Sequence, residues 1–458
     1  MAGDKLHRLI ASRSDTRGHR VLAHDPNPHR VRCEMATSPL SPTATCKLQP
    51  GRNTEEELES IEWLFCTQSF SRMVISDKWL PARRRGKVKF RLGELFCGPG
   101  GIGLAAKEAR VQSTDGRVFE IEHAWATDYD TDTCNTYRTN FFPTKPEAVV
   151  CEDIRTLDFE KLAEIEDEVD ALAFGFPCND FSVVGEQKGI NGEYGPLYTY
   201  CVKAVRRFRP KWFFAENVGG LRTANDGKAF RLILREFAEE GYDLYPHLYK
   251  FEEYGVPQTR HRIVIIGIRS DLGVRFGVPS PEPYRHLDVS ARTALTVPPI
   301  PEEAPNHELT KQAPYVVERL KYIKPGENAF TADLPDHLKL RVRGAKISQI
   351  YRRLDPDKPS YTITGSGGGG THVYHWSEPR ALTNRERARL QTFPDWFVFC
   401  GGKESVRKQI GMAVPPQGAK IILEAVLHSF AGHSYPTVPP NLRHHLDTMG
   451  QEVLPGVS

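Results

Sequence analysis

The stretch FGFPCNDFS, residues 174–182, places Cys178 directly behind Pro177 at the end of an apolar run. Proline fixes the backbone of the turn, and a thiol near the start of a following helix ionises more readily, so Cys178 has the setting of a nucleophile. Free cysteines are also commonly buried and inert. The stretch alone leaves both interpretations open.

Groups suited to acid–base and anion chemistry follow two other apolar runs. Glu216 ends the run KWFFAEN, and Gln258, Arg260 and Arg262 alternate within QTRHR. Alternate residues of an extended chain share a face, so the two guanidinium groups are expected to point at one site, suited to a phosphate or a polarised carbonyl oxygen. The alternatives are a solvated glutamate and two charges that merely flank an apolar strand.

A glycine-rich turn and two acidic residues point to a bound nucleotide-like group. Gly98, Gly100 and Gly103 form G-x-G-x-x-G in ELFCGPGGIGLA, a turn that suits NAD, FAD, S-adenosylmethionine or no ligand at all. Asp128 could accept hydrogen bonds from both hydroxyls of an adenosyl ribose, or simply cap the next helix. Asp153 could accept from an adenine amino group. Together these positions favour an adenosyl ligand.

These residues follow short apolar runs that alternate with longer amphipathic segments from Phe90 onward, the pattern of a parallel sheet wrapped by helices. Ligands of such sheets bind beyond the carboxyl ends of the strands, so the candidate groups are expected to meet at one edge. The expected strands are residues 90–96, 121–127, 148–150, 169–175, 211–215 and 262–268.

The regular pattern covers only part of the chain. Residues 1–88 are rich in Arg, Ser, Pro and His and are expected to be a disordered basic extension, with an arm that contacts nucleic-acid phosphates as the alternative. Residues 270–375 contain many prolines and the glycine-rich run 365–370, which indicates a second, smaller domain. Two helices are expected near 383–392 and 416–430, the first with a capping box, Thr383 and Glu386.

Composition limits the remaining classes. The 458 residues carry a net charge of +3, and no apolar run approaches the roughly 20 residues that cross a bilayer. The nine cysteines form no C-x-x-C pair, so neither a zinc site nor a disulfide framework is indicated. We expect a cytoplasmic protein with reduced thiols and no metal.

Six blocks of the chain resemble, in the same order, those of the C5-cytosine-specific DNA methyltransferases of the bacterial modification type. The blocks are ELFCGPGG, GFPCNDFS, AENV, QTRHR, RALTNRERARLQTFPD and GMAVPPQGAK. The resemblance implies an α/β fold, a Rossmann-like S-adenosylmethionine-dependent methyltransferase sheet with a smaller inserted target-recognition domain. It implies a catalytic domain at 89–269, target recognition at 270–405, a return segment of the catalytic domain at 406–432 and a tail at 433–458.

The resemblance also implies a role for each catalytic residue. Cys178 would add to cytosine C6, which makes C5 reactive toward the methyl donor. Glu216 would hydrogen-bond N3 and the exocyclic amine, Arg262 would contact O2, and Arg260 would lie near the nucleophile and its backbone. The target cytosine would be flipped out of the duplex. The sequence does not identify the base that removes the C5 proton, and water is one candidate.

Further positions match the cofactor pocket and the DNA surface of the family. The cofactor positions are Phe96, Gly98, Gly100, Asp128, Asp153, Ile154, Leu197 and Val414. The candidate DNA contacts are the glycine-rich run and Lys339, Arg341, Arg343, Lys346, Arg352 and Arg353. Three residues depart from the usual pattern: Glu94 replaces Asp, Asn179 replaces Gln, and Met412 replaces the Asn of GNAVPP. The change at Met412 alone puts cofactor affinity or the hold on that loop in doubt.

We therefore expect a monomeric, cytoplasmic, nucleoid-associated DNA (cytosine-5-)-methyltransferase that acts on a specific duplex sequence in restriction-modification. Double-stranded DNA is its partner, and a separate cognate restriction endonuclease is left open. One alternative is an RNA cytosine-5 methyltransferase of the same fold, which would lack the long insert between Gly267 and Arg380. Another is a catalytically inactive DNA-binding homologue, which Met412 keeps open. A dinucleotide oxidoreductase leaves Cys178 and Glu216 unexplained.

Overall fold

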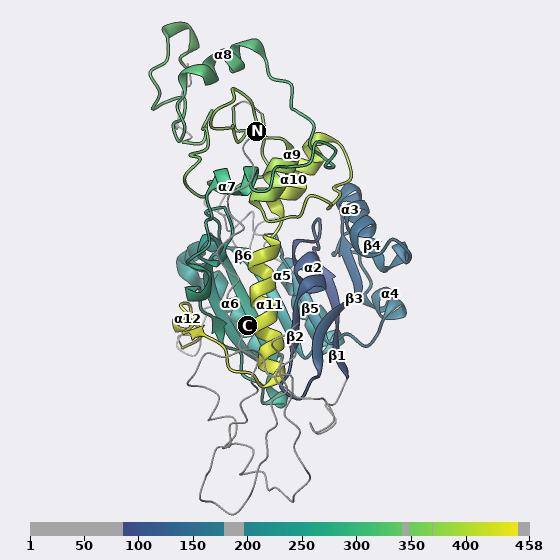
Figure 1. The fold of residues 1–458 in the computed structure, drawn as a ribbon. Coiled ribbons are helices and arrows are strands. Elements are labelled where there is room, and N and C mark those ends of the chain that lie inside the picture. Colours follow the sequence, from purple (N-terminus) through teal and green to yellow (C-terminus); the bar gives the residue numbers. More distant parts are fainter. Residues whose placement is uncertain (1–85, 178–196, 341–347, 369, 448–458) are drawn as a thin grey trace, which may run out of the picture. The chain divides into compact units, whose positions relative to one another are not determined.

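The computed structural model describes residues 86–177, 197–340, 348–368 and 370–447. An eight-stranded sheet with the order β2-β3-β1-β5-β6-β8-β7 lies at its centre, and β4 pairs with β3 (Figure 1). The strands are β1 (Lys87–Leu95), β2 (Arg110–Gln112), β3 (Val118–Asp128), β4 (Val149–Cys151), β5 (Ala171–Phe174), β6 (Trp212–Val218), β7 (Tyr242–Lys250) and β8 (His261–Arg269).

All six expected strands are present, and β2 and β7 are additional. Strands β1, β3, β4, β5 and β6 run parallel, whereas β8 is antiparallel to β6 and to β7. Strand β7, with the sequence YDLYPHLYK, is difficult to predict because Pro246 is unfavourable in the interior of a sheet. Proline is tolerated in β7 because this strand is at the edge of the sheet. The reversal of β8 puts its amino end, with Arg262 opposite Val218, at the carboxyl end of β6.

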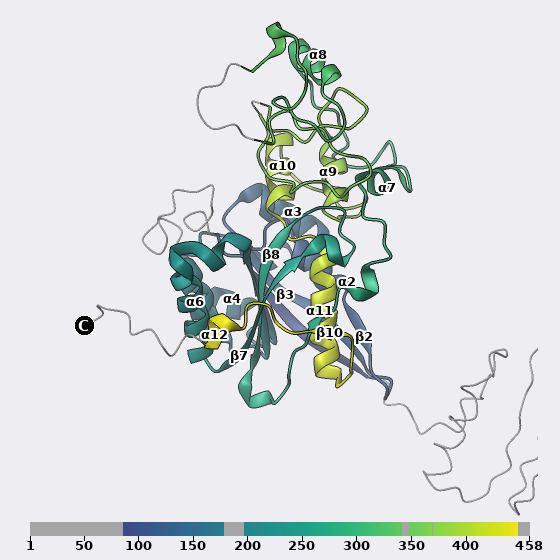
Figure 2. The same cartoon turned by 90° about the vertical axis from the view of Figure 1, so that its left-hand side faces the viewer.

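Helices cover both faces of the sheet, and the alternation of each strand shows why. In β5, Ala171 and Ala173 face one apolar cluster while Leu172 and Phe174 face another. Helices α2 (Gly101–Glu108) and α11 (Pro416–Ala431) pack in the first cluster, and α4 (Phe159–Ile165), α5 (Tyr198–Phe208) and α6 (Lys228–Glu239) in the second. Figures 1 and 2 show α11 and α6 on opposite sides of the strands. Helix α3 (Thr131–Phe141) packs against β3 and β4.

Among the described residues, one helical stretch, Lys403–Ala431, is long and apolar enough to span a membrane by length and composition. It comprises α10 (Lys403–Met412) and α11, and 78% of its most apolar window is buried inside the protein. Residues of α11 such as Ile422 and Val426 are fully buried against the sheet. The apolar character of this stretch therefore serves the core.

Regular structure was expected to fail over residues 270–375, and residues 270–405 are largely irregular. Their helices are α7 (Ala291–Thr296), α8 (Pro314–Tyr322), α9 (Asn384–Leu390) and the start of α10, and β9 (Val278–Pro279) pairs with β10 (Thr437–Val438). The expected helices near 383 and 416 are α9 and α11, whereas α10 was not predicted. The remaining short elements are η1 (Pro146–Ala148), η5 (Gly219–Gly227), η6 (Phe251–Tyr254), η7 (Ser270–Leu272), η8 (Glu282–Tyr284), η9 (Asp336–Leu338) and α12 (His444–Asp447).

Buried arginines replace regular hydrogen bonding in this irregular part. The guanidinium of Arg353 donates to the carbonyls of Leu320, Ile323, His375 and Glu378. Buried carbonyls need a donor, and a five-donor fork can serve several of them at once. Arg353 is 6% exposed. It is therefore not available as the DNA contact that the sequence suggested.

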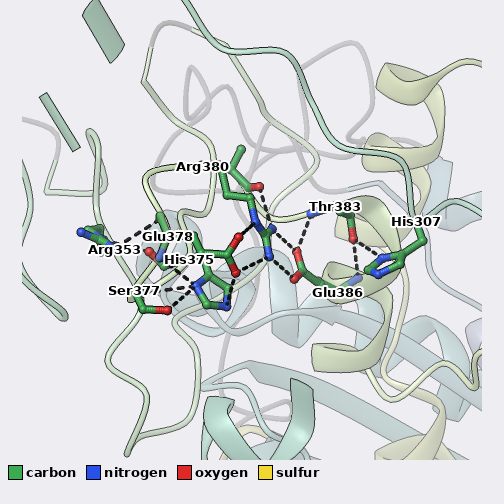
Figure 3. Close-up of polar contacts among 9 residues, drawn as sticks. His307, Arg353, His375, Ser377, Glu378, Arg380, Thr383 and Glu386 are labelled. Atoms are coloured by element: carbon green, nitrogen blue, oxygen red, sulfur yellow. Dashed lines mark hydrogen bonds and ion pairs between the residues drawn. The ribbon is translucent and has the colours of Figure 1, made fainter. Parts of the chain in front are cut away.

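A polar network fixes the start of α9 (Figure 3). Thr383 and Glu386 form the predicted capping box: the Thr383 hydroxyl accepts from the backbone N–H of Glu386, and the Glu386 carboxylate accepts from that of Thr383 at 2.7 Å. Arg380 adds two hydrogen bonds of 2.8 Å to the same carboxylate and also pairs with Glu378. The segment before α9 is thus tied to the first turn of the helix by bidentate ion pairing.

Candidate active site

The carboxyl edge of the sheet gathers several of the predicted residues. Phe96 follows β1, Asp128 ends β3, Glu216 lies near the end of β6, and Arg262 begins β8 beside it. Strand β5 leads through Gly175–Pro177 to Cys178. Cys178 and Asn179 themselves lie outside the described residues.

Glu216 and Arg262 form a largely buried ion pair. The Arg262 Nε atom lies 2.9 Å from Glu216 Oε1, and the two side chains are 14% and 12% exposed. Burial raises the pKa of Glu216, while the positive charges of Arg262 and Arg260 oppose that shift. A carboxyl group with a raised pKa, oriented by a guanidinium, is suited to donating a proton or a hydrogen bond.

The segment before Cys178 lies against this carboxyl group. A Cβ atom built on Gly175 would sit 3.2 Å from Glu216 Oε2, so glycine permits the close approach. The Asn217 side chain donates from Nδ2 to the carbonyl of Phe176 at 3.1 Å. The neighbours Glu216 and Asn217 therefore contact the two residues that precede Pro177.

Gln258 and Arg260 have a different task from Arg262. The Gln258 amide accepts from the N–H of Ile363 and donates to the carbonyl of Leu390. Arg260 is 1% exposed and donates to the carbonyls of Ile363, Gly411 and Ala413 at 2.9–3.0 Å. Burial lowers the pKa of Arg260, with the charge of Arg262 acting in the same direction. The guanidinium groups of Arg260 and Arg262 were expected to point at one site. This expectation is met only in part, because the hydrogen bonds of Arg260 go to backbone carbonyls.

The glycine turn is held by Asp128. Its carboxylate accepts from the N–H of Gly98 at 3.0 Å and from that of Asp130 at 3.1 Å. Phe96, Gly98 and Gly100 all have positive φ values, 52°, 55° and 92°. The last of these begins α2 without a side-chain cap, which leaves the first N–H groups of the helix for another acceptor. Burial raises the pKa of Asp128.

The return segment closes on the same turn. The carbonyl oxygen of Val414 lies 2.2 Å from where a Cβ atom of Gly101 would be. Met412, the departure from the family pattern, is 50% exposed. Arg260 bonds the carbonyls on either side of Met412, so this loop is held without an amide at position 412.

Three predicted cofactor residues share one apolar cluster, in which Ile154 and Leu197 are buried and Phe96 packs against them. Asp153 has its carboxylate on Arg155, with a closest distance of 2.6 Å, and hydrogen bonding to Arg155 lowers its pKa. Tyr129, which the sequence analysis did not name, directly follows Asp128 and is 64% exposed. An aromatic residue directly after an acidic strand end was the sequence signal for it.

Glu94, another departure from the family pattern, is buried and hydrogen-bonded. The side chain is 1% exposed, and its Oε2 atom accepts a 2.7 Å hydrogen bond from the hydroxyl of Tyr137. Burial raises the pKa of Glu94 to about 8, and the hydrogen bond from Tyr137 opposes the shift. The carboxyl group is therefore mostly protonated near neutral pH. Within the part of the chain that the structure describes, no three His, Cys, Asp or Glu side chains are grouped to hold a metal ion.

The chain was compared with known proteins. The family model described as C-5 cytosine-specific DNA methylase matches residues 90–428. A Type II methyltransferase, M.BbvI of Brevibacillus brevis, is 60% identical over 358 residues, which cover 77% of this chain and 94% of the relative. M.NgoFVII of Neisseria gonorrhoeae, also a Type II methyltransferase, is 40% identical and covers 75% and 88% of the two chains.

Solved structures agree in fold. A putative DNA modification methyltransferase encoded within a prophage of E. coli superposes with a TM-score of 0.56 at 23% identity, covering 74% of this chain and 99% of that one. Identity at this level supports the shared fold.

Proposed function

The chain belongs to the C-5 cytosine-specific DNA methylases and is a DNA cytosine-5-methyltransferase, and from this premise we propose how its residues act. Cys178 is the nucleophile that adds to C6 of a flipped-out cytosine. The observation that carries the proposal is the largely buried Glu216–Arg262 pair, in which Glu216 lies against the residues that lead into Cys178. A thiolate needs an electron-poor C6, and a group that protonates or hydrogen-bonds N3 supplies it.

Glu216 is proposed to hold cytosine by N3 and the exocyclic amine. Its raised pKa favours the protonated form, which donates to N3 as negative charge develops during thiolate addition. A carboxyl group that reads both atoms also distinguishes cytosine from thymine, whose N3 carries a hydrogen. Arg262, whose Nε atom lies 2.9 Å from Glu216, is proposed to orient that carboxyl group and to donate to the cytosine O2 atom.

Arg260 is proposed to position rather than to touch the base. Its three hydrogen bonds join the end of β8 to Ile363 and to the return segment at Gly411 and Ala413. Arg260 thus connects the carboxyl edge of the sheet, where Glu216 and Arg262 lie, to the return segment, which contacts the glycine turn. Its loss is expected to disturb cofactor and base sites together.

The residues at the glycine turn suit S-adenosylmethionine, on which this family depends and which supplies an electrophilic methyl group when bound. The uncapped N–H groups of α2 can receive the cosubstrate's carboxylate, and Asp128 can accept from ribose hydroxyls. The exposed ring of Tyr129 and the side chains of Phe96 and Ile154 offer apolar contact for an adenine. Asp153 is proposed as an acceptor for the adenine amino group.

The setting is proposed to be restriction-modification in the bacterial cytoplasm, with double-stranded DNA as substrate. The support is the pair of relatives named Type II methyltransferases. Residues 270–405 are proposed to read the target sequence. This long segment is the feature that an RNA methyltransferase of the same fold was expected to lack.

Trapping the covalent adduct tests the proposed nucleophile. On DNA with 5-fluorocytosine at the target position, methyl transfer leaves fluorine on C5, so the proton loss that expels Cys178 is blocked and the adduct persists. Wild type with S-adenosylmethionine should give a denaturation-resistant protein–DNA complex, and Cys178→Ala should give none while still binding DNA. Cys151→Ala, which removes an exposed thiol, is the matched control and should retain the adduct. An adduct with Cys178→Ala would overturn the assignment.

A further inference from the structure

Two buried arginines meet beneath the glycine tract, which is defined here as residues 365–368. Arg387 of α9 is 1% exposed and Arg407 of α10 is 7% exposed. Burial, and then the charge of Arg407, lowers the pKa of Arg387 to about 10, so the Arg387 guanidinium is charged at neutral pH. His372, which accepts from Arg387 Nη2 at 3.2 Å, has its pKa lowered by burial and by both arginines to about 4 and is neutral.

Their N–H groups are largely unpaired. Arg387 Nε and Nη1 and Arg407 Nε are buried and have no hydrogen-bond partner in the described structure. Glu404 lies 3.4 Å from Arg407, but its side chain is 88% exposed, so the pair is weak. Buried cations that lack a counter-charge are costly. Arg260 also has one unpartnered buried nitrogen, Nε, but its other nitrogens donate to three carbonyls, whereas two of the three nitrogens of Arg387 are unpartnered.

The glycine tract packs directly on Arg407, one of these two arginines. A Cβ atom on Gly367 would lie 2.1 Å from Arg407 Nε, and Arg407 Nη2 donates to the Gly367 carbonyl at 3.0 Å. Gly365 packs directly on the backbone of Lys408 and Gly411. Ser366 and Gly368 are exposed. No described residue accepts the backbone N–H of Ser366, Gly367 or Gly368.

We propose that the glycine tract, with Arg387 and Arg407 beneath it, binds one phosphodiester group of the DNA backbone. Backbone N–H groups of a glycine-rich turn and arginine forks are the donors that phosphates prefer. The phosphate supplies a counter-charge to two arginines whose only carboxylate partner among the described residues is the exposed Glu404 of Arg407. This inference rests on the proposed function, because it takes DNA as the substrate and names one contact that residues 270–405, together with Arg407 of the return segment, make with it.

Arg387→Met and Arg407→Met test the site, with Arg117→Met as the matched control. Arg117 pairs with Asp115 at the turn before β3, which is the opposite end of that strand from Asp128. DNA affinity is measured by fluorescence anisotropy between 50 and 200 mM salt, on target and non-target duplexes. Losing one phosphate contact should reduce the slope of log affinity against log salt by about 0.9, equally on both duplexes. Arg117→Met should keep the wild-type slope.

The melting temperature without DNA separates this site from a purely structural one. Removing an unpaired buried charge should leave Arg387→Met at least as stable as wild type. An unchanged salt slope in both variants, or a lower melting temperature with unchanged slope, would overturn the phosphate site. Because Arg407 is nearer the surface, Arg407→Met decides the question if Arg387→Met does not fold. A wild-type protein that binds no DNA at 50 mM salt would contradict the proposed function itself.

Discussion

The Arg262 guanidinium lies 2.9 Å from the Glu216 carboxylate, and both side chains are nearly buried at the carboxyl edge of the sheet. Burial raises the pKa of Glu216 and Arg262 pulls it back. The pair therefore holds a carboxyl group on whose pKa burial and a neighbouring cation act in opposite directions.

Replacing Arg262 should move the pH profile. Arg262→Met removes a cation that lowers the pKa of Glu216, so that pKa should rise further and the alkaline limb of kcat/KM should shift to higher pH. The rate should also fall, by roughly 10²-fold or more, because the carboxyl group loses its orientation. Arg262→Lys keeps the charge and should keep the limb near the wild-type pH. A limb that stays in place in Arg262→Met would dissociate Glu216 from the pH dependence.

Glu94 should make stability fall as pH rises. Its folded pKa of about 8 lies above the ordinary 4.5, so between these values the folded state retains a proton that the unfolded state has lost. The contribution of Glu94 to the free energy of unfolding is fully present below about pH 4.5 and declines by about 1.4 kcal/mol per pH unit toward pH 8. Urea unfolding of Glu94→Gln should lack this slope, whereas Glu147→Gln, an exposed control, should retain it. Parallel pH curves for wild type and Glu94→Gln would contradict the buried proton.

Arg260 should matter for stability more than a surface arginine. Arg260→Met leaves three buried carbonyls without a donor, at a cost of about 3 kcal/mol or more in the free energy of unfolding. Arg292→Met, which breaks an exposed pair with Asp357, should cost about 0.5 kcal/mol or less. Urea unfolding measures both. Equal losses would show that the carbonyl contacts of Arg260 contribute little.

These arginines show where sequence reasoning stops. The strand ends that carry Asp128 and Glu216 follow from apolar alternation within a few residues, so they were predictable. The partners of Arg260 lie 103 to 153 residues away in sequence, in segments without regular periodicity. Nothing local distinguishes Arg262, which meets a carboxylate, from Arg260, which meets backbone carbonyls. The same reason hid the burial of Arg353.

In the return segment, the departure at Met412 put cofactor affinity or the hold on the loop in doubt, because the family residue carries an amide. The structure bears only on how the loop is held. The anchor is instead provided by Arg260 and by the close approach of Val414 to Gly101. A motif position therefore indicated which loop mattered, while the hold on that loop depended on a distant side chain.

Gly101 should be intolerant of even one added methyl group. A Cβ atom there would lie 2.2 Å from the Val414 carbonyl oxygen, so Gly101→Ala must displace the return segment from the glycine turn. Binding of S-adenosylhomocysteine, measured by calorimetry, should weaken by roughly tenfold or more, which corresponds to about 1.4 kcal/mol. Gly402→Ala, where a Cβ atom meets nothing within 4 Å, should bind as wild type does. Unchanged affinity in Gly101→Ala would separate the return segment from the cosubstrate site.

The most direct test of the account is base-resolution methylation sequencing of DNA from cells that express the wild-type chain or Cys178→Ser. The account predicts 5-methylcytosine at one recurrent duplex sequence with wild type and none with Cys178→Ser, although both proteins are soluble. Methylation by Cys178→Ser, or unmethylated DNA in cells that contain soluble wild-type protein, would contradict it.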